Sequence, residues 1–194
     1  IRPYEWIPIL FSPAAGAILI ITFLVSLKKR PLGQWMAVAV FLASTVVGFL
    51  GSYFHLRRAI LPAGATDSVN IIPLFIWAPP ALAPLTYCLI GLLGFLSIWH
   101  EDPLDSGRLV LFGGKHLQMP FSKSRAFFFT VSMGCLATVV SSVIDHARTD
   151  FSNPWLWLPT ALGVFAVIIA LITGIFDQPN RGDLIVYTLT MGCM

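Results

Sequence analysis

Residues Pro154–Ile175 read PWLWLPTALGVFAVIIALITGI, a run that contains no Asp, Glu, Lys, Arg or His. An α-helix rises about 1.5 Å per residue, so roughly 20 apolar residues are needed to cross the hydrocarbon core of a bilayer. This run is long enough and apolar enough to do so. We therefore predict that it forms a transmembrane helix.

Other parts of the chain have the same character. Of its 194 residues, 57% are hydrophobic and 11% are charged, whereas a soluble domain carries about 25% charged residues. Four further runs are uncharged and long enough to span a membrane: Ile7–Leu27, Trp35–Phe54, Ile72–Trp99 and Ala126–Ile144. We predict an all-α, polytopic integral membrane bundle, with residues 1–194 forming a single transmembrane domain.

A short apolar run, Leu184–Met194, resembles the beginning of a sixth transmembrane helix. Its TLTMGCM matches the TVSMGCL of Thr130–Leu136, near the start of an earlier span. Eleven residues do not cross a bilayer, and a helix end in lipid would leave carbonyl groups unsatisfied. We expect the natural protein to continue beyond Met194 to a polar residue, His or Arg, on the outer face.

Two short motifs recur at the ends of the predicted spans. Trp-x-Pro occurs at Trp6, Trp77 and Trp157, where odd-numbered spans begin, and His-x-Arg follows two even-numbered spans, at His55 and His146. Trp favours the membrane interface, and Pro suits the first turn of a helix. About six transmembrane helices would then form three repeated hairpins. They cover about 4–58, 72–150 and 154–194, and the last is incomplete.

The positions of Lys and Arg predict the orientation. Eight of them fall in one set of loops and four in the other, which favours the first set as cytoplasmic and the N-terminus as outside. We expect a bacterial inner membrane protein. The first set is Lys28, Lys29, Arg30, Arg108, Lys115, Lys123, Arg125 and Arg181; the second is Arg2, Arg57, Arg58 and Arg148.

The longest predicted cytoplasmic loop covers residues 99–125. Gly113-Gly114 within it is suited to a two-residue β-hairpin turn. His100, Glu101, Asp102 and His116 are residue types that bind metals, but their spacing matches no metal motif. We predict no metal site there, and expect a solvated loop that contacts lipid headgroups or a partner.

His55 and His146 are the candidate cofactor-binding residues, with Arg57 and Arg148 as possible partners of an anionic group. Imidazole can ligate haem iron, chlorophyll magnesium or another metal, and Arg can pair with a propionate or phosphate. The alternative is anchoring at the interface, where His and Arg end a helix and a cation suits its C-terminal dipole. The sequence requires no cofactor, and we favour anchoring.

Catalytic motifs such as H-E-x-x-H, G-x-S-x-G, the P-loop and G-x-G-x-x-G are absent from the sequence. The five complete spans also lack the ionisable residues that mark coupled transport. We therefore expect a non-catalytic subunit that scaffolds or stabilises a larger membrane complex, for example an energy-converting complex of photosynthesis or respiration. Its expected partners are lipids and other membrane subunits, with no nucleic acid. The alternatives are a cofactor-binding membrane protein and a passive transporter of a neutral solute.

Overall fold

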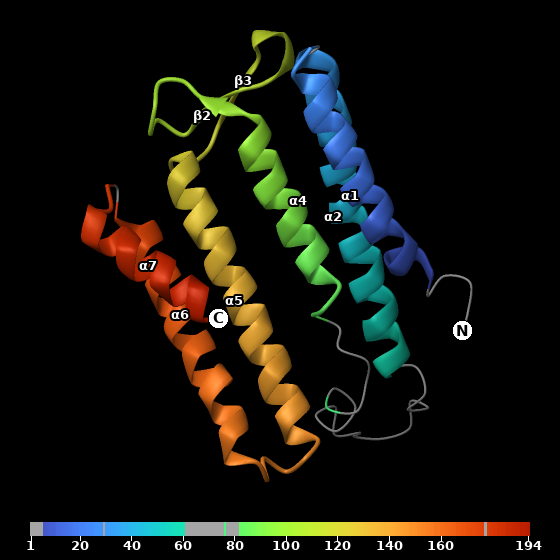
Figure 1. The fold of residues 1–194 in the computed structure, drawn as a ribbon, viewed down its shortest axis with the longest axis vertical. Coiled ribbons are helices and arrows are strands. Elements are labelled where there is room, and N and C mark those ends of the chain that lie inside the picture. Colours follow the sequence, from blue (N-terminus) through green and yellow to red (C-terminus); the bar gives the residue numbers. More distant parts are fainter. Residues whose placement is uncertain (1–5, 29, 61–75, 77–81, 177) are drawn as a thin grey trace.

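The computed structural model describes residues 6–28, 30–60, 76, 82–176 and 178–194. These residues are mostly helical, and six α-helices are found among them (Figure 1). The helices are α1 (Trp6–Ser26), α2 (Arg30–Ile60), α4 (Leu85–Ile98), α5 (Lys123–Ala147), α6 (Trp157–Ile175) and α7 (Arg181–Cys193).

Four helical segments are long and apolar enough to cross a membrane: Ile9–Ser26, Arg30–Arg57, Lys123–Ala147 and Pro154–Ile175. They coincide with four of the predicted spans, which indicates a membrane protein. Helix α4 is apolar but has 14 residues, because it begins at Leu85 after the turn that ends at Pro84. Most of the first part of the predicted span Ile72–Trp99 lies outside the described residues. Helix α7 corresponds to the predicted sixth, short helix.

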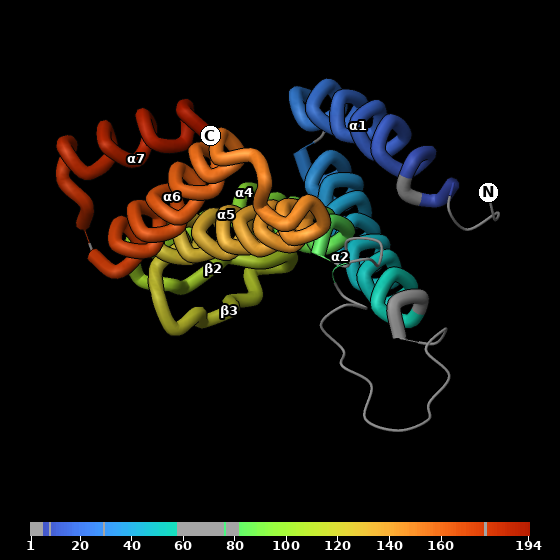
Figure 2. Tube along the Cα trace, turned by 90° about the horizontal axis from the view of Figure 1, so that it is seen from below, coloured from blue at the N-terminus to red at the C-terminus, as the bar shows by residue number. Residues whose placement is uncertain are grey.

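Successive helices run in alternating directions and form an open row (Figures 1 and 2). Each helix makes its main contacts with the helices before and after it in the chain: α1 with α2, α2 with α4, α4 with α5, α5 with α6, and α6 with α7. The turn between α1 and α2, the loop between α4 and α5, and the turn between α6 and α7 lie at one end of this row. We call it the loop end, and the opposite end the exit end.

The α2–α4 and α5–α6 pairs have the most extensive contacts. A Cβ atom added to Gly91 of α4 would lie 2.1 Å from Thr45 Oγ1 and 2.7 Å from the Phe41 carbonyl oxygen of α2. A Cβ atom added to Gly163 of α6 would lie 2.6 Å from Val139 Cγ2 of α5. Small residues therefore allow close approach of the helices, as is common in membrane proteins. We call these two contacts the small-residue seams.

The seams join helices that the sequence assigns to neighbouring hairpins. The repeat predicted α1 with α2, α4 with α5, and α6 with α7 as its units, and these pairs have less extensive contacts than the two seams. The three-hairpin repeat therefore stays a prediction.

The loop between α4 and α5 contains a three-stranded antiparallel sheet, so the chain is mostly helical and not all-α. Its strands are β1 (His100–Glu101), β2 (Arg108–Val110) and β3 (His116–Gln118), with β2 in the middle. The turn between β2 and β3 lies at the predicted position, but it is a three-residue 3-10 turn, Phe112–Gly114, and not the predicted two-residue turn. Gly113 and Gly114 have φ values of 67° and 72°, which suit glycine. Phe112 stacks on Trp35 of α2 at 3.8 Å between ring centroids, which fixes the sheet against the helices.

Candidate functional site at the helix ends

His146 lies in the last turn of α5, at the exit end, and binds the start of the next helix. Its Nε2 atom is 3.1 Å from the carbonyl oxygen of Leu156 and 3.1 Å from Oγ of Ser142. A carbonyl oxygen only accepts hydrogen bonds, so Nε2 carries the proton in this contact. His146 therefore donates from α5 to the backbone that leads into α6.

Two hydroxyl groups extend this contact. Thr160 of α6 donates to the carbonyl oxygen of Leu156 at 3.2 Å, and its Oγ1 is also 3.2 Å from Ser142 Oγ. Thr160 is buried, whereas Ser142 and His146 are partly buried. Buried polar groups cost stability unless they are paired, and this network pairs them while joining α5 to α6.

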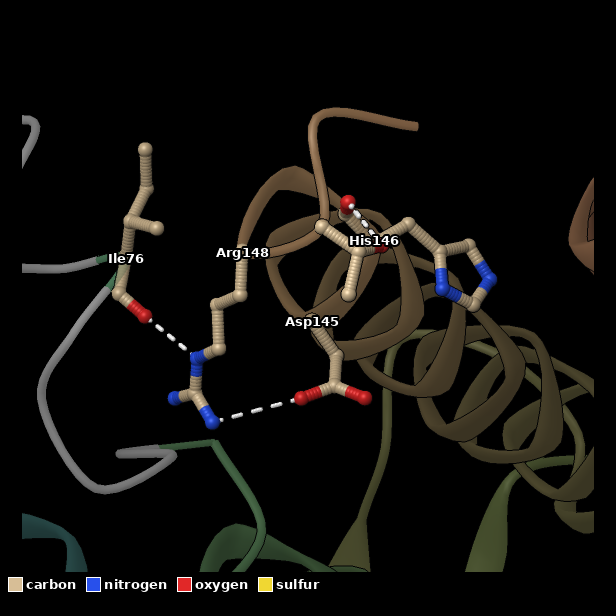
Figure 3. Close-up of polar contacts among 5 residues, drawn as sticks. Ile76, Asp145, His146 and Arg148 are labelled. Carbon is tan, nitrogen blue, oxygen red and sulfur yellow. Dashed lines mark hydrogen bonds and ion pairs between the residues drawn. The ribbon is translucent and has the colours of Figure 1, made fainter. Parts of the chain in front are cut away.

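Arg148 follows two residues after His146, and its contacts include Ile76 and Asp145 (Figure 3). Its Nε donates to the carbonyl oxygen of Ile76 at 2.6 Å, and its Nη1 lies 3.2 Å from Oδ1 of Asp145. The Asp145 side chain is 69% exposed, and exposed ion pairs contribute about 0–1 kcal/mol. Of these two contacts, the bond to the Ile76 backbone therefore contributes more to the position of Arg148.

Together, His146 and Arg148 form what we call the exit clamp. Leu156 directly precedes Trp157 of one Trp-x-Pro motif, and Ile76 precedes Trp77 of another. One His-x-Arg motif therefore binds the carbonyl groups in front of two Trp-x-Pro motifs. The sequence predicted both motifs at the same end but not this bonding. Trp77 itself lies outside the described residues.

His55 occupies a different environment, near the end of α2. It lines a pocket of about 270 Å³ between α1, α2 and α4, where its neighbours include Leu50, Phe54 and Tyr87. Arg57 is exposed at the same end of the helix. His55 and His146 thus lie at the same end of the molecule but in separate places, since α4 lies between α2 and α5 (Figure 2).

The long loop between α4 and α5 contains four residues of types that bind metals: His100, Glu101, Asp102 and His116. Within the described ranges, no group of three His, Cys, Asp or Glu side chains is placed to hold a metal ion. Glu101 is buried, and its carboxylate accepts the backbone N–H groups of Gly107 and, at 3.3 Å, of Lys123. It therefore connects the sheet to the first turn of α5. The sequence did not predict this role. The signal that could have indicated it is the position of Glu101, a carboxylate two residues after the end of an apolar span.

Comparison with known proteins adds no assignment: no family model, curated protein or solved structure matches this chain. Cofactor binding by His55 or His146 therefore remains a prediction, and a function has to be argued from the residues themselves.

Proposed function

We propose that the protein is a non-catalytic integral membrane subunit that holds other membrane proteins in a larger complex. The observation that supports this best is the exposed face of α1. Among the described residues, this helix makes its main contacts with α2, and Pro13, Gly16 and Ala17, which share one face of it, are exposed.

Small residues on a membrane helix are typical of helix–helix contacts, because they let two backbones approach closely. Elsewhere in this chain, Gly91 and Gly163 lie in seams where an added Cβ atom would collide with the next helix. An added Cβ atom at Gly16 would meet nothing within 4 Å. The α1 face thus resembles a seam without its second helix, and we propose that a helix of another subunit packs there.

Co-purification after extraction in a mild detergent tests this proposal. We expect the full chain to migrate as a large complex on a native gel, with other membrane proteins identifiable in the band. Gly16→Leu should remove a partner, because the larger side chain blocks close approach without disturbing this chain. Gly192→Leu is the matched control, since an added Cβ atom there also meets nothing within 4 Å. A monomer, or equal co-purification with both variants, would contradict the proposal.

We further propose a bacterial inner membrane location, with the loop end in the cytoplasm and the N-terminus outside. The charge asymmetry of the loops supports this orientation. Arg30, Arg108, Lys115, Lys123 and Arg181 belong to the segments at the loop end.

Cofactor binding is the second candidate, and the apolar pocket beside His55 favours it. An imidazole next to a cavity lined by Leu50, Phe54 and Pro84 is suited to a hydrophobic ring that needs one nitrogen ligand. An absorption spectrum of the purified protein is the test. A Soret or chlorophyll band that disappears in His55→Ala but persists in His116→Ala would support it, whereas a spectrum without such bands would reject a porphyrin-type cofactor.

A further inference from the structure

A groove of about 740 Å³ lies at the loop end, between α4, α5 and the start of α7. Its apolar lining includes Leu93, Phe127 and Leu184, which lie inside these helices. Its polar lining includes Lys123, at the start of α5, and Asp105, in the loop between β1 and β2. The groove is therefore apolar where helices line it and polar where they end.

The groove follows from the packing of the helices. The α2–α4 and α5–α6 pairs are joined by small-residue seams, whereas α4 and α5 have less extensive contacts. Gly134 of α5 illustrates this: a Cβ atom added there would lie 3.4 Å from Leu89 Cδ1, an ordinary contact distance. Phe128 of α5 meets Tyr187 of α7 edge-to-face at 5.0 Å, so α7 contacts α5 next to the groove.

The charges at the polar part are of both signs. Lys123 Nζ donates to the Trp99 carbonyl oxygen at 2.8 Å, which uses one of the three donors of an ammonium group. Glu101 also lines the groove, but its carboxylate accepts the backbone N–H groups of Gly107 and Lys123. Asp105 contributes a second, exposed carboxylate. A purely anionic headgroup would face these carboxylates as well as Lys123.

We propose that this groove binds one phospholipid whose headgroup carries both a phosphate and a primary ammonium, namely phosphatidylethanolamine. Its phosphate pairs with Lys123, its ammonium pairs with Asp105, and the upper part of its acyl chains lies against Leu93, Phe127 and Leu184. This pairing of opposite charges with an apolar continuation is what distinguishes a lipid site from a site for a free phosphate ion. The inference requires a membrane protein but does not depend on the proposed scaffold function.

Native mass spectrometry of the delipidated full chain in detergent tests the proposal. Phosphatidylethanolamine and phosphatidylglycerol with identical acyl chains are added separately, together with glycerophosphoethanolamine, which has the headgroup but no chains. We expect one phosphatidylethanolamine to be retained at concentrations where phosphatidylglycerol is not. Equal or tighter binding of phosphatidylglycerol would overturn the headgroup assignment. Equal binding of glycerophosphoethanolamine would show that the site binds a soluble phosphate compound instead of a lipid.

Two pairs of variants locate the site. Ser97→Trp places a large ring in the groove, and Thr86→Trp is its control on α4, because both residues are exposed and both hydroxyls bond to a carbonyl three residues earlier. Asp105→Asn removes the proposed ammonium partner, and Asp102→Asn removes the same charge outside the groove lining. We expect Ser97→Trp to abolish the bound lipid, and Asp105→Asn to reduce the preference for phosphatidylethanolamine about threefold. If Ser97→Trp and Asp105→Asn both retained phosphatidylethanolamine as the unchanged protein does, the proposed location of the lipid site would be wrong.

Discussion

At the scale of single residues, the exit clamp gives the sharpest expectation. His146 donates to the Leu156 carbonyl oxygen, and His146→Ala leaves that carbonyl without this donor. We expect a loss of about 1 kcal/mol in unfolding free energy, or roughly 2–4 °C in the midpoint of thermal unfolding in detergent. His146→Gln should recover part of this, because its amide can donate. His116→Ala, on the exposed strand β3, is the control, and equal midpoints for both alanine variants would contradict the clamp.

The contribution of the Arg148 bond to Asp145 can be measured separately from that of its bond to the Ile76 carbonyl oxygen. Asp145→Asn removes only an exposed ion pair, and we expect it to change stability by less than about 0.5 kcal/mol. Arg148→Ala also removes the donor to Ile76, and we expect a loss of about 1–2 kcal/mol, since hydrogen bonds that involve a charged group contribute more than neutral ones. Thermal unfolding of the two variants side by side measures the difference. A larger effect of Asp145→Asn would show that the ion pair, not the backbone bond, positions Arg148.

At the scale of helices, the seam between α2 and α4 depends on Gly91. A Cβ atom there would lie 2.7 Å from a backbone oxygen, that of Phe41, and backbone cannot move aside as a flexible side chain can. We expect Gly91→Ala to cost about 1–3 kcal/mol. Gly192→Ala is the matched control, because an added Cβ atom there meets nothing within 4 Å and alanine favours helix by up to about 1 kcal/mol. A Gly91→Ala protein as stable as wild type in thermal unfolding would show that the two helices separate without cost.

The attachment of the three-stranded sheet to α5 depends on Glu101. Glu101→Ala leaves the backbone N–H groups of Gly107 and Lys123 without their carboxylate partner, at a cost of about 1–3 kcal/mol. We expect trypsin to cleave the loop about tenfold faster, at Arg108 or Lys115, because opening of the sheet becomes easier. Asp102→Ala, which changes an adjacent exposed carboxylate, serves as the control. Equal cleavage rates in the two variants would mean that Glu101 does not hold the loop.

The sequence predicted some of these elements and not others, for identifiable reasons. Uncharged runs locate the membrane-length helices because composition alone decides them. Gly113-Gly114 marks the position of its turn because glycine readily adopts the positive φ found at both residues, but it does not give the length of the turn, which includes Phe112. Strand β1 has two residues, so it has no pattern of its own and forms only by pairing with β2. The bonds of His146 and Arg148 join segments that their motifs place at the same end, but spacing along the chain does not say which carbonyl each side chain reaches.

At the scale of the whole molecule, the helices form an open row, and the seams explain why it holds together without a large core. Among the described apolar residues, those with 0% exposure are small, Ala166 and Ala170 of α6, so close backbone contact replaces the interlocking of large side chains there. Many of the large apolar side chains, such as Phe23 at 64% exposure, face outwards, although Phe128 is buried at 8%. Such a row is suited to contacts on both faces, with lipid or with other subunits.

The orientation of this row in the membrane is the remaining prediction. Lys115 lies in the loop end beside the Gly-Gly turn, and Trp155, which is 78% exposed, lies at the exit end between α5 and α6. With Cys193, the exposed cysteine among the described residues, changed to serine, Lys115→Cys and Trp155→Cys each introduce one accessible thiol at a known end.

We expect a membrane-impermeant maleimide to label Trp155→Cys in spheroplasts and Lys115→Cys only in inverted membrane vesicles. The reason is that the loop end contains most of the Lys and Arg residues, which are retained on the cytoplasmic side. Labelling after detergent extraction shows that both thiols react when access is equal. The reverse pattern would place the N-terminus inside. Labelling of both variants from one side would show that α5, the helix between Lys115 and Trp155, does not cross the membrane.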